Sequence, residues 1–299
     1  MLSTGNYILQ QTINALSLGS VYALVAIGLA MVFGILQLIN FAHGDLMMLS
    51  CYVFFFLAAA GVPFVAALLL AVLAGALMGV VMERVAYRRL RGRASVSMLL
   101  SSLAVSIILQ NLVILVESPQ ARSFPAPDYL STPLRLGVLT TSTIDVITVA
   151  AAVALLIGLT LLVTRTRVGI AMRAAADDLM AANLVGINLN SVIVFAFAVG
   201  SALAAVAGFL WATRVGKFDP MMGFLPVLKA FVAAVIGGFG SLPGAVLGGY
   251  VLGFLEIFLI GFLPPGLSTF RDALVFFILI VVLLIRPNGI LGSTEGEKV

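Results

Sequence analysis

The chain has 299 residues, of which 62% are hydrophobic and only 9% are charged. A soluble globular domain carries about 25% charged residues, so this composition excludes a water-soluble domain, a disordered chain and a nucleic-acid-binding protein. A single cysteine, Cys51, and a single histidine, His43, leave neither an internal disulfide nor a histidine–cysteine metal site. The composition therefore predicts an all-α, polytopic membrane helix bundle.

Nine apolar runs follow one another along the chain, and we expect eight or nine of them to cross the membrane. Leu46–Ala60 and Val227–Ile236 are shorter than the roughly 20 residues of a full span, so each is predicted to be tilted, re-entrant or broken. Short loops join the runs, so residues 1–299 are predicted to form a single transmembrane domain. The runs are Ile8–Leu36, Leu46–Ala60, Pro63–Val81, Met98–Val116, Ile144–Val163, Val192–Ala212, Val227–Ile236, Ala245–Leu263 and Ala273–Ile285.

Small residues recur at every fourth position within several runs, as in Ala15, Gly19 and Ala23, or in Gly249 and Gly253. In a membrane such spacing lets helix backbones approach closely and gain van der Waals contact. It predicts a tightly packed bundle.

Basic residues predict the orientation of the chain. If the runs alternate in direction, ten of the sixteen Lys and Arg residues fall on one side, and the positive-inside rule places that side and the C-terminus in the cytoplasm. The N-terminus is then outside, and Glu117–Thr143 is predicted to be an irregular external loop. The cytoplasmic set is Arg84, Arg88, Arg89, Arg91, Arg93, Arg165, Arg167, Arg173, Arg286 and Lys298, whereas Arg122, Arg135, Arg214 and Lys217 fall outside.

The sequence contains no motif for nucleotide hydrolysis or zinc catalysis. None of its three lysines, Lys217, Lys229 and Lys298, stands in a G-x4-G-K-[ST] loop, which binds nucleotide phosphates through backbone amides and a lysine. With one histidine, an H-E-x-x-H site is impossible. We therefore expect a non-catalytic chain that binds no cofactor and does not hydrolyse ATP by itself.

Two charged residues, Lys229 and Glu256, lie in or near apolar runs. An ionisable group inside a membrane is costly, so each is a functional-site hypothesis. Two interpretations stay open: the residues pair with each other or with backbone groups, or they belong to an ion relay.

The segment Gln37–Asp45 places Asn40, His43, Gly44 and Asp45 at the junction of the first two runs. Gly44 favours a sharp turn, and His43 could form a hydrogen-bonded pair with Asp45. The segment is either a plain interfacial turn or a re-entrant element that lines a path through the membrane.

A polar, patterned segment at about residues 165–190 separates the fifth and sixth runs. Every residue of Ile170–Leu184 is compatible with a helix, and Gly186 is a stop signal after it. This cytoplasmic helix is amphipathic, so it either lies in the membrane interface or docks into a groove on a partner.

Three sequence blocks resemble the permease family of branched-chain amino-acid ABC transporters, of the LivH type. The middle block, Gly169–Asn188, contains Ala181-Ala182-x3-Gly186, which is similar to the loop by which ABC-importer permeases engage their ATPase subunits; Met180 stands where that loop has Glu. The other blocks are Gly34–Leu49 and Leu228–Ala245, so the resemblance reaches nearly the whole chain.

The resemblance implies the permease subunit of an ABC importer in the bacterial cytoplasmic (inner) membrane, with leucine, isoleucine and valine as substrates. The implied partners are a second related permease chain, two cytoplasmic ATPase subunits that bind ATP-Mg, and an external or periplasmic substrate-binding protein. Contact with the ATPase is implied for Arg173, Asp177, Asp178, Ala181, Ala182, Gly186 and Ile187, while Asn40, His43, Gly44 and Asp45 remain candidates for the translocation path.

Two alternatives stay open. An importer of the same type for urea, short amides or other amino acids would share these features, because relatives of the family carry those solutes. A secondary transporter coupled to an ion gradient would need ionisable groups near the membrane midplane on discontinuous helices, for which Lys229 and Glu256 are the candidates.

Overall fold

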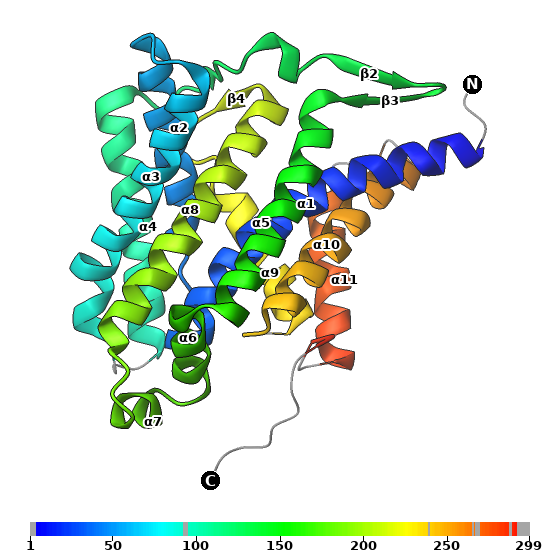
Figure 1. Ribbon diagram of the computed structural model, residues 1–299. Coiled ribbons are helices and arrows are strands. Elements are labelled where there is room, and N and C mark those ends of the chain that lie inside the picture. Colours follow the sequence, from blue (N-terminus) through cyan, green and yellow to red (C-terminus); the bar gives the residue numbers. More distant parts are fainter. Residues whose placement is uncertain are drawn as a thin grey trace.

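The computed structural model describes residues 4–91, 95–238, 240–264, 266, 270–286 and 289–291. It is a bundle of helices, which confirms the predicted all-α membrane fold (Figure 1). The helices are α1 (Thr4–Leu36), α2 (His43–Ala59), α3 (Phe64–Met82), α4 (Ser95–Glu117), α5 (Thr143–Arg165), α6 (Arg167–Asp177), α7 (Leu179–Leu184), α8 (Leu189–Val215), α9 (Phe224–Gly237), α10 (Leu242–Phe262) and α11 (Arg271–Ile285). Arg93 and Lys298, two of the predicted cytoplasmic basic residues, lie outside the described residues.

Six helices of the described chain are long and apolar enough to cross a membrane: α1, α3 with its continuation to Leu90, α4, α5, α8 and α10. The continuation of α3 is a π-helical turn, Glu83–Tyr87, followed by a 3-10 turn, Arg88–Leu90. The two runs that looked too short for a full span form the short apolar helices α2 and α9.

The segment between α4 and α5 is not wholly irregular, as the sequence predicted, but contains a β-hairpin. Strand β2 (Pro133–Leu136) pairs antiparallel with β3 (Leu139–Ser142), and Gly137 adopts a φ of +66° in the two-residue turn between them. A two-residue hairpin turn needs a residue with positive φ, which Gly137 provides. The prolines of the segment pointed to an irregular loop instead, so the sequence did not reveal the hairpin. We call the end of the bundle that carries this hairpin the hairpin face.

Two further strands close the hairpin face. Strand β1 (Arg122–Ser123) precedes the hairpin and pairs antiparallel with β4 (Lys217–Phe218), which follows α8. The opposite end of the bundle carries α6 and α7, and we call it the α7 face (Figure 1).

The two halves of the bundle run in opposite directions. In α1–α4 the long helix α1 is followed by the short helix α2 and then by two further helices. The same order recurs in α8–α11, where α8 is long and α9 is short. Helix α1 runs from the hairpin face to the α7 face, whereas α8 runs from the α7 face to the hairpin face (Figure 1). The packing of the two halves is equivalent. Helix α1 packs on α10 and α9 of the other half, and α8 packs on α3 and α2, which occupy the same places in the first half. This is the arrangement of an inverted-topology repeat.

The helices approach closely where small residues face each other. Helices α1 and α8 cross at Gly28 and Gly200, where a Cβ on Gly28 would lie 3.0 Å from the carbonyl oxygen of Gly200, and one on Gly200 would lie 2.9 Å from that of Gly28. The predicted pairs also meet, because Gly249 and Gly253 of α10 pack against Ala23 and Gly19 of α1. Backbone-to-backbone packing therefore holds the two halves together.

Candidate functional site

The two short helices begin at the same place inside the bundle. The carbonyl group of Gly223, just before α9, lies where a Cβ on Gly44 would project, and the carbonyl of Gly44 lies where a Cβ on Gly223 would project. Before α2, residues 37–40 form neither helix nor strand, residues 41–42 form a turn, and Gln37 has a φ of +52°. The segment Gln37–Asp45 is thus an interior break between helices rather than a turn at the surface.

Polar side chains of other helices hold this break in place. Tyr87 Oη donates a hydrogen bond to Asn40 Oδ1 at 2.7 Å, and Ser102 Oγ of α4 donates to the carbonyl oxygen of Ile39 at 3.0 Å. Gln110 Nε2, also on α4, donates to Asp45 Oδ1 at 2.9 Å. The break is therefore fixed to α4 and to the end of α3.

Three side chains at the break keep an unpaired polar atom. Asn40, His43 and Asp45 are at most 2% exposed, yet Asn40 Nδ2, His43 Nε2 and Asp45 Oδ2 have no hydrogen-bond partner among the described residues. The hydrogen bond expected between His43 and Asp45 is not formed, because residues two apart on a helix point in different directions. An unpaired polar atom in a closed interior is costly, so these three atoms could bind a polar group that enters the break.

The two intramembrane charges are paired. Lys229 Nζ of α9 lies 2.9 Å from Glu256 Oε1 of α10, and both residues are 4% exposed. Tyr22 Oη of α1 donates to Glu256 Oε2 at 2.7 Å. At the start of α11, Asp272 lies 3.0 Å from Lys229 Nζ, and Arg271 lies 3.5 Å from Glu256. Two cations and two anions balance, so the cluster ties α1, α9, α10 and α11 together.

Sequence reasoning missed three members of this cluster. Tyr22 is an ordinary aromatic residue in an apolar run, and Arg271 and Asp272 precede the last run rather than lie within it. No local pattern links them to Glu256, because Tyr22 is 234 residues away in the sequence, and Arg271 and Asp272 belong to α11 whereas Glu256 belongs to α10.

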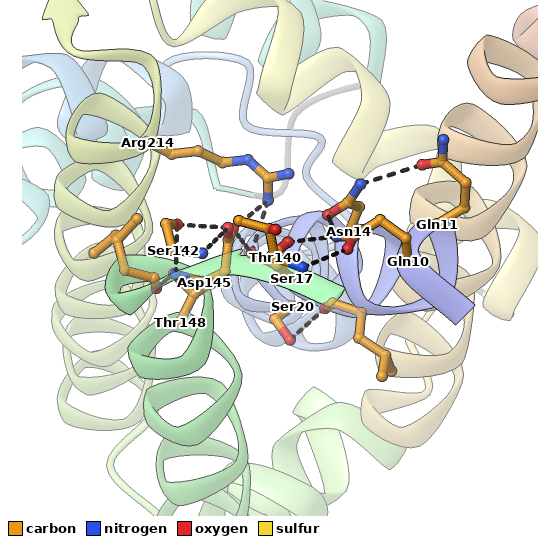
Figure 2. A network of polar contacts seen from close by, with 12 residues as sticks. Gln10, Gln11, Asn14, Ser17, Ser20, Thr140, Ser142, Asp145, Thr148 and Arg214 are labelled. Carbon is orange, nitrogen blue, oxygen red and sulfur yellow. Dashed lines mark hydrogen bonds and ion pairs between the residues drawn. The ribbon is translucent and has the colours of Figure 1, made fainter. Parts of the chain in front are cut away.

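A second polar network lies at the hairpin face (Figure 2). Arg214 of α8 reaches Asp145 of α5 at 3.3 Å and donates to Ser17 Oγ of α1 at 2.7 Å, and Ser17 Oγ donates to Asp145 Oδ1 at 2.6 Å. The side-chain amide of Gln10 bonds both the N–H and the C=O of Thr140 in β3, at 2.9 and 2.6 Å. The network links both halves of the bundle to α5 and the hairpin.

The predicted helix Ile170–Leu184 is broken in two at Asp178. Asp178 has an extended backbone (φ −155°, ψ 110°), and its carboxylate accepts hydrogen bonds from Met180 N at 2.7 Å and Ala181 N at 3.0 Å. Aspartate favours this N-cap position over a helix interior, because its side chain replaces the missing backbone acceptor. The prediction of one continuous helix was wrong for that reason.

Helix α7 is short, capped at both ends and exposed. Gly186 adopts a φ of +86° and bonds Asn183 O, while Ile187 N bonds Ala182 O at 3.0 Å, which is the Schellman pattern. Ala182 is buried and fixes the helix to the bundle. The outer surface is apolar: Met180, Leu184 and Val185 are 77%, 82% and 77% exposed.

Arg173 and Asp177, for which the family resemblance implies contact with the ATPase, lie on α6, whereas Ala181 and Ala182 lie on α7. Both line a cavity of about 920 Å³ between α1, α5, α6 and α10. A separate groove of about 750 Å³ runs beneath α7 and is lined by Gly186, Ile187 and Arg91, among others. Arg91 there forms an ion pair with Glu83 and donates to Asn190 Oδ1 at 2.6 Å, which joins the end of α3 to the start of α8.

Known proteins match this chain over nearly its whole length. A family model described as branched-chain amino acid transport system / permease component matches residues 11–284. The high-affinity branched-chain amino acid transport system permease protein BraD of Pseudomonas aeruginosa is 41% identical, over 97% of this chain and 98% of its own. The permease LivH of Escherichia coli, described in the same words, is 40% identical over 98% of each chain.

A more distant relative is the probable branched-chain amino acid transport permease protein LivH of Methanocaldococcus jannaschii, which is 30% identical over 93% of this chain and 90% of its own. No solved structure matches the chain. The family model and the two bacterial relatives confirm the resemblance that the three sequence blocks indicated. The chain therefore belongs to the branched-chain amino acid transport system permease family, as a multi-pass membrane subunit of a transport system.

Proposed function

We propose that this chain is one of two permease subunits of an ABC importer that carries leucine, isoleucine and valine into the cell. The names of the relatives, which are permeases of high-affinity branched-chain amino acid transport systems, support this substrate class. ATP hydrolysis takes place on separate subunits, because the sequence has no phosphate loop. An external binding protein delivers the substrate to the hairpin face.

The coupling proposal rests on one observation: α7 is a short helix that is capped at both ends and exposes an apolar surface. A helix of six residues is too short to be stable by itself, yet here Asp178, Gly186 and the buried Ala182 hold it rigid. The exposed apolar side chains of Met180, Leu184 and the adjacent Val185 form a patch that suits an apolar groove on a partner. We assign that groove to the ATPase, which moves α7 when ATP binds.

The α7 face is cytoplasmic in this proposal. Eight of the ten predicted inside residues are described, and they follow α3, α5 and α11 near that end of the bundle: Arg84, Arg88, Arg89, Arg91, Arg165, Arg167, Arg173 and Arg286. The positive-inside rule then places the C-terminus in the cytoplasm of a bacterial inner membrane. Asn40, His43, Gly44 and Asp45, at the meeting point of the two halves, lie on the translocation path, since transporters of inverted topology bind substrate where discontinuous helices meet.

Transport by the isolated chain and by the assembled complex tests the proposal. The tagged chain is purified from its native membrane, the associated subunits are identified by mass spectrometry, and the complex is reconstituted into proteoliposomes. We expect ATPase subunits to co-purify and uptake of radiolabelled leucine to require both ATP and the binding protein. Uptake of urea or acetamide in place of leucine would assign the alternative cargo. Uptake by this chain alone, driven by an ion gradient, would refute the proposal.

A further inference from the structure

The cavity beside α6 has an apolar floor and a charged mouth. Its floor is formed by α1, α5 and α6 side chains that are at most 6% exposed, namely Ile27, Ala30, Met31, Leu159, Val163 and Met172. The volume of about 920 Å³ falls within the range of small-molecule sites. The cavity lies in the half of the bundle nearest the α7 face, because its walls are the last turns of α1 and α5 and the first turns of α10.

The only charged side chains in the described lining are Arg173 and Asp177. They are four residues apart on α6 and therefore lie on the same side of that helix, one turn from each other. Both are exposed, and neither has an ion-pair or hydrogen-bond partner among the described residues. One free cation and one free anion thus stand side by side over an apolar floor.

This set of groups matches one class of solute. An amino acid with a branched aliphatic side chain presents a carboxylate, an ammonium group and a hydrocarbon body. A guanidinium binds a carboxylate through two parallel hydrogen bonds, a carboxylate accepts from an ammonium group, and the apolar floor removes the side chain from water. Urea and short amides lack both the charges and the hydrocarbon body, so they fit the cavity poorly.

We propose that this cavity binds a zwitterionic, branched aliphatic amino acid, with its carboxylate on Arg173, its ammonium group on Asp177 and its side chain on the floor. The inference rests on the proposed function and adds to it a site on the α7 side of the bundle. There the substrate is held between the closed meeting point of α2 and α9 and the cytoplasm. Every group named here comes from this chain.

A photoreactive leucine tests the site directly. The whole transporter in nanodiscs, without nucleotide or binding protein, is irradiated with photo-leucine, whose side chain carries a diazirine, and the labelled residues are identified by mass spectrometry. We expect label on the floor residues, and we expect leucine to compete about tenfold or more better than isoamylamine, which lacks the carboxylate, or 4-methylpentanoate, which lacks the ammonium group.

Each charged residue should account for the advantage of leucine over one of the two analogues. In Arg173→Gln, leucine should compete no better than isoamylamine, and in Asp177→Asn it should compete no better than 4-methylpentanoate. This readout does not depend on ATP, so a defect in ATPase coupling alone would not produce it. Equal loss for all three competitors in both variants would overturn the assignment.

Filling the cavity provides a matched pair of variants. Thr160→Trp on α5 places an indole in the cavity and should abolish labelling of the floor. Val153→Trp, two turns earlier on the same face of α5 and outside the cavity, should label as the parent does. Release of the second permease chain by Thr160→Trp would assign the cavity to a subunit interface and overturn the inference.

Leucine uptake by the parent complex, measured in parallel, separates the two proposals. Normal ATP-dependent uptake with label outside the cavity would overturn the site and leave the proposed function standing. Absence of leucine uptake by the complete complex would refute the proposed function itself.

Discussion

Gly44 and Gly223 lie backbone against backbone, so that the first residues of α2 and the last residue before α9 occupy space that no side chain could share. The two glycines come from the two oppositely directed halves of the chain. Their contact joins the start of α2 to the start of α9 in the interior of the bundle.

Adding one methyl group at this contact should separate the two short helices. Gly44→Ala or Gly223→Ala is expected to destabilise the protein by about 1–3 kcal/mol through overpacking and to reduce leucine uptake. Gly158→Ala on α5 is the matched control, because a Cβ there meets nothing within 4 Å. Thermal unfolding in detergent and uptake in proteoliposomes measure both effects. Alanine variants at positions 44 and 223 that behave like the control would show that the contact is absent in the working protein.

The apolar patch on α7 should be needed for assembly but not for folding. Leu184→Asp places a charge at a side chain that is 82% exposed, so unfolding should change by no more than about 0.5 kcal/mol. If the patch is buried in an apolar groove of the ATPase, the same charge is costly there. The ATPase should therefore no longer co-purify. Met221→Asp, at a side chain that is 62% exposed and follows strand β4, should leave ATPase recovery unchanged. Full recovery with Leu184→Asp would remove α7 from the interface.

The C-terminal cap of α7 should tolerate asparagine better than valine. Gly186 has a φ of +86°, a conformation that costs a residue with a Cβ roughly 1–2 kcal/mol, and least for asparagine. Gly186→Val should therefore uncouple ATP hydrolysis from uptake, whereas Gly186→Asn retains most of the uptake. The ratio of leucine transported to ATP hydrolysed is the measurement. Equal ratios for the two variants would mean that the turn does not transmit the motion.

Removing Lys229 should be worse than removing the whole ion pair. Lys229→Met leaves Glu256 buried without its closest cation and is expected to cost about 3–5 kcal/mol. In the double variant Lys229→Met with Glu256→Gln the charge is gone and the amide still accepts from Tyr22, so much of the stability should return. Midpoints of thermal unfolding for the two single variants and the double variant complete the cycle. A double variant no more stable than Lys229→Met would argue against a purely structural pair.

The two faces should react with membrane-impermeant thiol reagents from opposite sides. Cys51 is buried and gives little background, so a cysteine introduced at Arg173 or Asp178 reports on the α7 face, and one at Val138 in the hairpin turn reports on the other. We expect Val138→Cys to be labelled in intact cells, and Arg173→Cys and Asp178→Cys only in inside-out vesicles. The reverse pattern would invert the topology.

Local sequence features predicted the elements but not their partners. Gly186 predicted the end of α7, because helix caps depend on neighbouring residues, whereas the Ala181–Ala182 pair was singled out by the family resemblance. The pairing of Arg214 with Asp145 and Ser17 depends instead on the crossing of α1, α5 and α8, and no local pattern encodes it. The break at Asp178 was missed because the residues around it, such as Ala176, Leu179 and Ala181, are strong helix formers, and the N-cap bonds of one carboxylate outweigh their small per-residue propensities.

The membrane bundle, the two short runs, the lack of a phosphate-loop motif and the family all follow from the sequence itself, because hydropathy, composition and motifs depend on neighbouring residues. The opposed halves, the meeting of Gly44 with Gly223 and the placing of Arg173 and Asp177 over an apolar floor were decided only by the tertiary structure. They depend on how helices far apart in the chain pack against one another, and packing is settled by the shapes of both surfaces together rather than by either segment alone.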